Sequence, residues 1–294
     1  MQGLLADLRE AQAKLRLRSD FDPGVTGCAD ALARLEARMS LRPRVVVLGE
    51  SNAGKTSLVN LLLDQALLPE SVVANTRRPM VLRFAETVLA TGITHSGRLD
   101  LRRDGIEPHD GSALESLEIG LPSERLASFD LVDTPALSTS VQLDPLRLGA
   151  ADLLLWCTVA TQAWKESERR LWMTISGRHR RYAILVATHE DSLRDDEDRR
   201  KIRARLTAET AECFRAIALV CATGRGKCVS LGQREHTSAA ELDALIANSL
   251  SVIARQRYRA GYRLANHIVG RALKLMERGR RLSVPRLNSL ATQK

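Results

Sequence analysis

The sequence predicts an α/β fold with a mainly parallel central sheet that is covered by helices on both faces. Apolar runs of strand length recur between residues 44 and 221, and helical patterns separate several of them. These runs are nearly continuous in apolar residues, as is typical of strands buried on both faces of a sheet. A glycine-rich segment joins the first run directly to the first helical pattern, the arrangement of a phosphate-binding loop.

The predicted elements follow in order along the centre of the chain. Strands are expected at residues 44–48, 80–87, 117–119, 128–132, 153–158, 182–187 and 217–221. Helices are expected at residues 55–64, 165–175 and 193–214.

Helical patterns also flank this centre. Residues 1–41 predict two helices, with a break at residues 20–27 and the second helix at 28–39. After residue 236 a capping pattern opens a helical periodicity that fades at Gly279 and that Gly261 and Gly270 could bend or divide. The predicted domains are N-terminal helices at 1–41, a nucleotide-binding domain at 42–236, a basic helical segment at 237–282 and a disordered tail at 283–294.

Composition limits the function classes. The 294 residues are 44% apolar, which is ample for a core, and they contain neither an apolar run near 18 residues nor the pattern of a secretory signal. The five cysteines form no CxxC pair, which favours reduced thiols in the cytoplasm. The net charge is +9, yet residues 252–294 alone hold eleven basic residues and one acidic residue. This basic end predicts an anionic partner (acidic lipid, nucleic acid or an acidic protein), or it is simply a solvated helix face.

The segment Gly49-Glu-Ser-Asn-Ala-Gly-Lys-Thr56 fits the pattern GxxxxGK[ST] of P-loop NTPases. Its glycines let the backbone wrap a polyphosphate, and its N–H groups lie at a helix N-terminus. Lys55 would bind the β- and γ-phosphates and Thr56 would bind Mg²⁺. The predicted phosphate-binding residues are Gly49, Glu50, Ser51, Asn52, Ala53, Gly54, Lys55, Thr56 and Ser57.

Three later segments resemble the elements by which GTPases recognise magnesium and guanine. Residues 130–136 form an apolar strand that ends in DTPA. By this resemblance Asp133 would hold the Mg²⁺ shell and the N–H of Ala136 would reach the γ-phosphate. Thr188, His189 and Asp191 stand where the [NT]KxD element stands, and Ala222 stands where a backbone N–H contacts the guanine O6. The Asp191 carboxylate would accept two hydrogen bonds from guanine that adenine cannot donate, so the nucleotide is expected to be GTP or GDP.

Residues 42–223 resemble the GTPase domain of the dynamin superfamily, in a short form without a full stalk. Asn75-Thr-Arg-Arg-Pro-Met-Val-Leu82 resembles the TRRP switch segment, and Asn52-Ala-Gly-Lys-Thr-Ser-Leu-Val-Asn60 resembles the dynamin P-loop. Residues 161–168 are similar to a loop of the bacterial relatives. The resemblance implies Mg²⁺-dependent GTP hydrolysis, with Thr76 as a catalytic residue and magnesium ligand. It also implies two GTPase domains that meet across the nucleotide, and flanking helices that pair as a small bundle; alternatively, those helices pack separately on the sheet.

Three positions depart from the dynamin pattern. Ser51 replaces the polar catalytic residue of the P-loop, Ala136 replaces the glycine of DxxG, and His189 replaces the lysine of [NT]KxD. We therefore predict slow or partner-dependent hydrolysis, with Lys55, Thr76 and Ser51 as the catalytic residues.

The leading hypothesis is a GTPase that acts as a dynamin-like switch or membrane-associated machine in the cytoplasm, or peripherally at the inner membrane. Its expected partners are a second copy or a dynamin-like protein across the GTPase face, and an anionic membrane through the basic helix. One alternative is a GTP-binding scaffold without useful turnover. Another is an Era-like RNA-associated GTPase, which the TRRP segment and the lack of a strand pattern after Thr223 disfavour.

Overall fold

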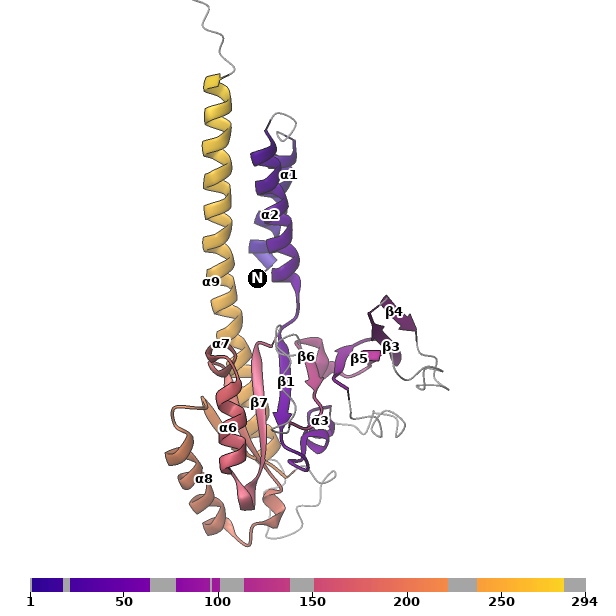
Figure 1. The fold of residues 1–294 in the computed structure, drawn as a ribbon, viewed down its shortest axis with the longest axis vertical. Coiled ribbons are helices and arrows are strands. Elements are labelled where there is room, and N and C mark those ends of the chain that lie inside the picture. The colour runs from indigo at the N-terminus through magenta and orange to yellow at the C-terminus, as the bar shows by residue number, and fades with distance from the viewer. Residues whose placement is uncertain are drawn as a thin grey trace, which may run out of the picture. The chain divides into compact units, whose positions relative to one another are not determined.

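The computed structural model describes residues 2–17, 22–63, 78–95, 97–100, 114–137, 151–221 and 237–282 (Figure 1). The chain divides into two compact units. One unit is Arg42–Leu250, and the other combines Met1–Leu41 with Ser251–Lys294. Each unit has its own hydrophobic core.

Within the described residues, the first unit contains a nine-stranded sheet in the order β4-β3-β5-β2-β6-β1-β7-β8-β9. The strands are β1 Arg44–Gly49, β2 Met80–Phe84, β3 Leu89–Thr94, β4 Gly97–Asp100, β5 Leu114–Leu121, β6 Asp130–Asp133, β7 Leu153–Val159, β8 Ala183–Thr188 and β9 Ala216–Leu219. The half from β6 to β9 is entirely parallel. β2 runs antiparallel to β6 and parallel to β5, and β3 and β4 complete an antiparallel edge.

Helices connect the parallel strands. They are α3 Lys55–Leu63, α6 Glu166–Thr174, α7 Gly177–Arg180 and α8 Asp196–Thr210, with short 3₁₀ turns η2 Glu124–Ala127, η3 Ala160–Gln162 and η4 Glu190–Ser192. The strands β7 and β8 are almost wholly buried, as expected of strands that are covered on both faces. The mainly parallel α/β fold predicted from the sequence is therefore confirmed.

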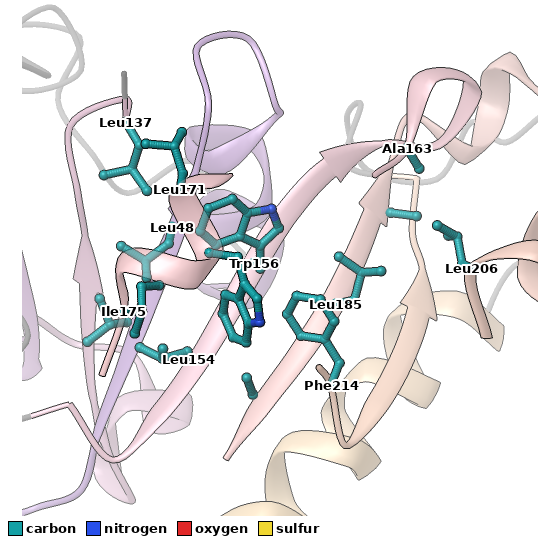
Figure 2. Close-up of a cluster of buried hydrophobic side chains, with 14 of the residues drawn as sticks. Leu48, Leu137, Leu154, Trp156, Ala163, Leu171, Ile175, Leu185, Leu206 and Phe214 are labelled. Carbon is teal, nitrogen blue, oxygen red and sulfur yellow. The ribbon is translucent and has the colours of Figure 1, made fainter. Parts of the chain in front are cut away.

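All three tryptophans of the chain lie in the core of this unit or pack against it. Figure 2 shows Trp156 among the buried side chains of this core. Trp156 on β7 meets Trp172 on α6 edge to face, with ring centroids 5.5 Å apart, and Trp164 packs edge to face on Phe214 at 5.1 Å. Such aromatic pairs contribute beyond the area that they bury. The cluster holds α6 and the end of α8 to β7, which pairs with β1, and to β8, which pairs with β7.

The second unit is a small bundle of α1 Gln2–Arg16, α2 Pro23–Ser40 and part of α9 Thr237–Leu282. Leu8 and Leu32 pack with Ile268 and Ala272 in its core. At Gly261 a side chain would lie 2.9 Å from Met39 Sδ, so this glycine permits close packing of α9 on α2. Of the two alternatives for the flanking helices, the structure contains the bundle.

The structure corrects three details of the prediction. The hairpin β3–β4 was not predicted because β4 is exposed throughout and its sequence carries no apolar alternation. The second helix begins at Pro23 rather than at residue 28: Asp22 caps it by accepting a hydrogen bond from the Gly24 N–H at 2.7 Å. Proline is well suited to the first turn of a helix, where its missing N–H costs nothing. Neither Gly261 nor Gly270 divides α9, which is one helix of 46 residues.

Candidate nucleotide-binding site

The P-loop spans the turn between β1 and α3. A side chain at Gly49 would lie 2.6 Å from the Cys157 carbonyl oxygen on the neighbouring strand β7, so only glycine fits there. Gly54 has φ +75°, and Asn52 takes the same left-handed region at φ 60°. The sequence therefore places glycine where the loop leaves β1 and where it enters α3.

Lys55 lies inside this loop with only 8% of its surface exposed. Its Nζ donates hydrogen bonds to the carbonyl oxygens of Gly49 at 3.1 Å and Glu50 at 2.7 Å. Burial lowers the pKa of Lys55, and the nearby carboxylate of Asp133 acts in the opposite direction. The Lys55 ammonium group is thus bound by carbonyl groups of the loop that would bind a polyphosphate.

Asp133 ends β6, the strand beside β1, in register with Val47. It is 5% exposed, and burial raises its pKa to about 6 although Lys55 opposes this shift. Its Oδ1 has no hydrogen-bond partner among the described residues. A buried carboxylate oxygen without a donor is costly, so a ligand that supplied a donor here would stabilise the folded state.

The segment after β6 runs alongside the P-loop. The Leu137 N–H donates to the Gly49 carbonyl at 3.0 Å, and Glu50 and Leu137 form a parallel bridge. The Thr134 hydroxyl donates to the Val47 carbonyl at 2.7 Å. Backbone pairing at Leu137 therefore joins the end of the DTPA segment to the P-loop, and Ala136, the last residue of DTPA, is exposed.

The predicted guanine element lies on the other side of the P-loop, at the end of β8. Thr188 is fully buried, and its Oγ1 lies 3.0 Å from the Ala53 carbonyl and 3.1 Å from the Thr158 carbonyl. His189 takes the left-handed conformation with φ 58°, and its Nδ1 lies 3.0 Å from Thr188 Oγ1. Asp191 is exposed in the turn η4. The structure shows the side chain of Thr188, which the sequence predicted as a nucleotide contact, hydrogen-bonded to the Ala53 carbonyl of the P-loop.

Comparison with known proteins agrees with this arrangement. Residues 45–189 match the sequence profile of the dynamin family, from β1 to His189, which is two residues before Asp191. Over these residues the chain is similar to the GTPase domain of the dynamin family.

Curated relatives include dynamin-like protein 2 of Campylobacter jejuni, which is 31% identical over 139 residues, 42% of this chain and 22% of the relative. The isoniazid-induced protein IniC of Mycobacterium tuberculosis is 31% identical over 121 residues, 37% of this chain and 24% of the relative. The matched part of the chain thus spans less than a quarter of either relative.

Two solved structures from an oligomerised bacterial dynamin pair, described as sensing and tethering membranes over long range, share the fold. One has a TM-score of 0.59 at 16% identity and covers 95% of this chain and 57% of its own. The other has a TM-score of 0.54 at 20% identity and covers 78% of this chain and 38% of its own.

Two buried polar residues near the P-loop, Thr158 and Glu168, were not among the predicted site residues. The Thr158 hydroxyl on β7 donates to Glu168 Oε2 at 3.0 Å, and the same oxygen accepts from the Lys165 N–H at 2.9 Å. Burial raises the pKa of Glu168, and these two hydrogen bonds oppose that shift. Thr158 therefore links the loop after β7 to Thr188 and the P-loop. The only signal in the sequence is the threonine near the end of an otherwise apolar strand.

Two predicted positions lie outside the described residues. They are Thr76, predicted as a catalytic residue and magnesium ligand, and Ala222, predicted to contact the guanine. Of the TRRP segment the structure describes Arg78, whose guanidinium donates to the Leu114 carbonyl, and Pro79. No helix in the described part of the chain is both long and apolar enough to cross a membrane.

Proposed function

We propose that this chain binds GTP together with Mg²⁺ and hydrolyses it to GDP and phosphate, as a dynamin-like GTPase. The proposal depends on the observation that hydrogen bonds connect the P-loop, the DTPA segment and the predicted guanine element at the carboxyl ends of β1, β6 and β8. The Leu137 N–H donates to the Gly49 carbonyl, and the Thr188 hydroxyl donates to the Ala53 carbonyl. Ligands of open α/β sheets bind at these strand ends.

The residues present fit magnesium bound through a nucleotide. Mg²⁺ usually keeps several waters and takes one or two protein oxygens besides the phosphates. The Oδ1 of Asp133 is buried without a hydrogen-bond donor among the described residues, as a carboxylate that receives a metal-bound water would be. The half-buried Thr56 opens α3 directly after Lys55, so its hydroxyl is the proposed direct ligand, with Thr76 as a second. Bound Mg²⁺ would offset charge on the β- and γ-phosphates.

In the proposed mechanism the protein mainly binds, orients and stabilises charge. Lys55 exchanges its bonds to the loop carbonyls for bonds to phosphate oxygens, where a positive charge favours the transition state. The exposed Ala136 offers its N–H to the γ-phosphate, and Asp191 reads the guanine. Ser51 would orient the attacking water, aided by Thr76. In dynamins the polar catalytic residue at this position is commonly glutamine; serine is shorter, so we expect slow turnover.

Titration with fluorescent GTP and ATP in Mg²⁺ tests this proposal. We expect GTP to bind more tightly than ATP, Lys55→Ala to abolish binding of both, and Asp191→Ala to remove the preference for GTP. Lys201→Ala is the matched control, because Lys201 lies exposed on α8 in an ion pair with Glu197. Equal affinity for GTP and ATP would refute guanine recognition, and normal binding by Lys55→Ala would refute the P-loop assignment.

A second candidate is a GTP-binding module with little or no turnover. It is favoured by Ser51 at the catalytic position and by His189, which is held at Thr188. A single-turnover assay separates the two candidates. Phosphate release that Lys55→Ala abolishes would eliminate the module, and bound GTP that stays intact would eliminate the GTPase.

We further propose that two copies meet across the nucleotide and that the basic end of α9 contacts anionic membranes. Hydrolysis that rises with protein concentration would support the dimer, and a constant specific activity would exclude dimer-activated chemistry. For the membrane, Arg255, Arg259 and Arg263 are exposed on α9. Flotation with anionic but not neutral vesicles would support this contact. Salt-dependent binding to RNA with no flotation would instead favour the Era-like alternative.

A further inference from the structure

The turn that carries Asp191 is held from several sides. Within it, the Ser192 N–H donates to the His189 carbonyl at 3.0 Å and the Leu193 N–H donates to the Glu190 carbonyl at 3.1 Å. The Glu190 N–H donates to the Val220 carbonyl at 3.2 Å, which ties the turn to the end of β9. A displacement of the Glu190 backbone would therefore also displace Asp191.

Glu190 and Asp191 differ in their environments although they are adjacent. The side chain of Glu190 is 4% exposed, whereas Asp191 is exposed. Burying a carboxylate is costly unless a cation compensates it. The Nε of Arg199, in the first turns of α8, lies 2.8 Å from Glu190 Oε1.

The helix that supplies Arg199 is anchored at its N-terminus and at its middle. Asp195 caps its N-terminus by accepting from the N–H groups of Glu197 and Asp198 at 2.9 and 2.8 Å. One turn beyond Arg199, Arg203 makes a bidentate pair with Glu241 of α9, at 2.7 and 2.8 Å. Arg199 therefore projects from a fixed helix, as a residue that positions a loop should.

We infer that Arg199 is a positioning residue for guanine recognition: its ion pair with the buried Glu190 fixes the turn that presents Asp191. The inference rests on the proposed GTP binding. Without Arg199 the buried Glu190 carboxylate loses the ion pair at 2.8 Å, and burial of its charge then favours a shift of the turn toward water. Consecutive Cα atoms lie about 3.8 Å apart, so Asp191 moves with its neighbour.

The ratio of the dissociation constants for ITP and GTP tests this role. Hypoxanthine, the base of ITP, lacks the 2-amino group from which Asp191 would accept a hydrogen bond. The ratio of the two dissociation constants therefore measures the contact of Asp191 with the base. A hydrogen bond to a charged group predicts a ratio of about 10 or more in the wild type. In Arg199→Ala we expect the ratio to fall by about fivefold, within the range of coupling between contacting residues. A loss of folded protein alone would leave the ratio unchanged.

Further variants keep the test decisive. Arg199→Lys should restore part of the ratio, and Lys201→Ala, which breaks an exposed pair on the same helix, should leave it at the wild-type value. If Arg199→Ala does not fold, the double variant Glu190→Gln/Arg199→Met removes the ion pair without leaving a buried charge, and its ratio should also fall. A wild-type ratio in a folded Arg199 variant would overturn the inference while GTP binding stands. Equal affinities of the wild type for ITP and GTP would overturn this inference and guanine recognition together.

Discussion

Replacing Asp133 by asparagine is expected to stabilise the protein in the absence of nucleotide and Mg²⁺. Burial raises the pKa of this carboxyl from 3.8 to about 6. Each unit of difference between the folded and unfolded pKa corresponds to 1.36 kcal/mol, so ionised Asp133 costs the folded state about 3 kcal/mol at neutral pH. Asparagine has nearly the same shape and carries no charge, so it should recover most of this free energy of unfolding.

The pH dependence has a definite sign. Between about pH 4 and pH 6 the folded state binds the proton of Asp133 more tightly than the unfolded state does, so the stability that this group contributes is lost as pH rises through that window. Asp133→Asn should therefore gain little at pH 4 and most at pH 7 and above. Its binding of GTP with Mg²⁺ should be lost, because the magnesium shell loses its anionic acceptor.

Urea denaturation in EDTA, followed by tryptophan fluorescence, measures this gain. All three tryptophans lie in the core of the unit that contains Asp133 or pack against it, so their emission reports its unfolding. Asp196→Asn on the exposed start of α8 is the control, and it should change stability little at any pH. A variant at Asp133 that is no more stable than the wild type at pH 7, or whose gain does not vary with pH, would refute the reasoning.

Three further predictions concern the same site. Gly49→Ala would bring Cβ to 2.6 Å from a backbone oxygen of β7 and should cost about 3 kcal/mol of stability in denaturation, whereas Gly177→Ala, with no heavy atom within 4 Å, should be neutral to within about 1 kcal/mol. Thr188→Val removes the hydroxyl that is hydrogen-bonded to the Ala53 carbonyl of the P-loop. It should lower the free energy of unfolding by about 1–3 kcal/mol in denaturation and weaken GTP binding in titration. If neither value changed, Thr188 would not support the P-loop. Asp191→Asn presents an amide N–H to the base, so fluorescence titration should show preference moving from GTP to XTP, whose base has a carbonyl at C2; a retained preference for GTP would exclude Asp191 as the reader.

Local patterns explain how much of the fold could be predicted. The P-loop and the buried strands β1, β7 and β8 are encoded by contiguous residues, so the sequence was sufficient for them. The start of α2 was misplaced because Pro23 and Gly24 are usually breakers, and their effect depended on the cap from Asp22. The continuity of α9 at Gly261 depends on packing against Met39, more than two hundred residues away.

The candidate site likewise contains residues that local motifs predict and contacts that only the tertiary structure reveals. Lys55 and Asp133 could be named from motifs, and the structure places both inside the site. The inward bonding of Thr188 and the pair between Glu190 and Arg199 could not be named, because their partners are set by strand order and helix docking. The roles of Thr76 and Ala222 stay predictions.

The described site is arranged at some cost to the folded state. Lys55 is buried on its own loop's carbonyls, which lowers its pKa, and Asp133 is buried with an oxygen that has no donor among the described residues. Both groups would gain stronger partners from a magnesium-bound triphosphate, and the binding free energy would then include relief of this cost. Thr188 and the pairing of Leu137 with Gly49 keep the loop from relaxing to relieve it alone. A fold that buries Lys55 and Asp133 away from water would be stabilised by a ligand that binds both groups. Such a difference in stability is the physical basis for a protein whose conformational state depends on the bound nucleotide.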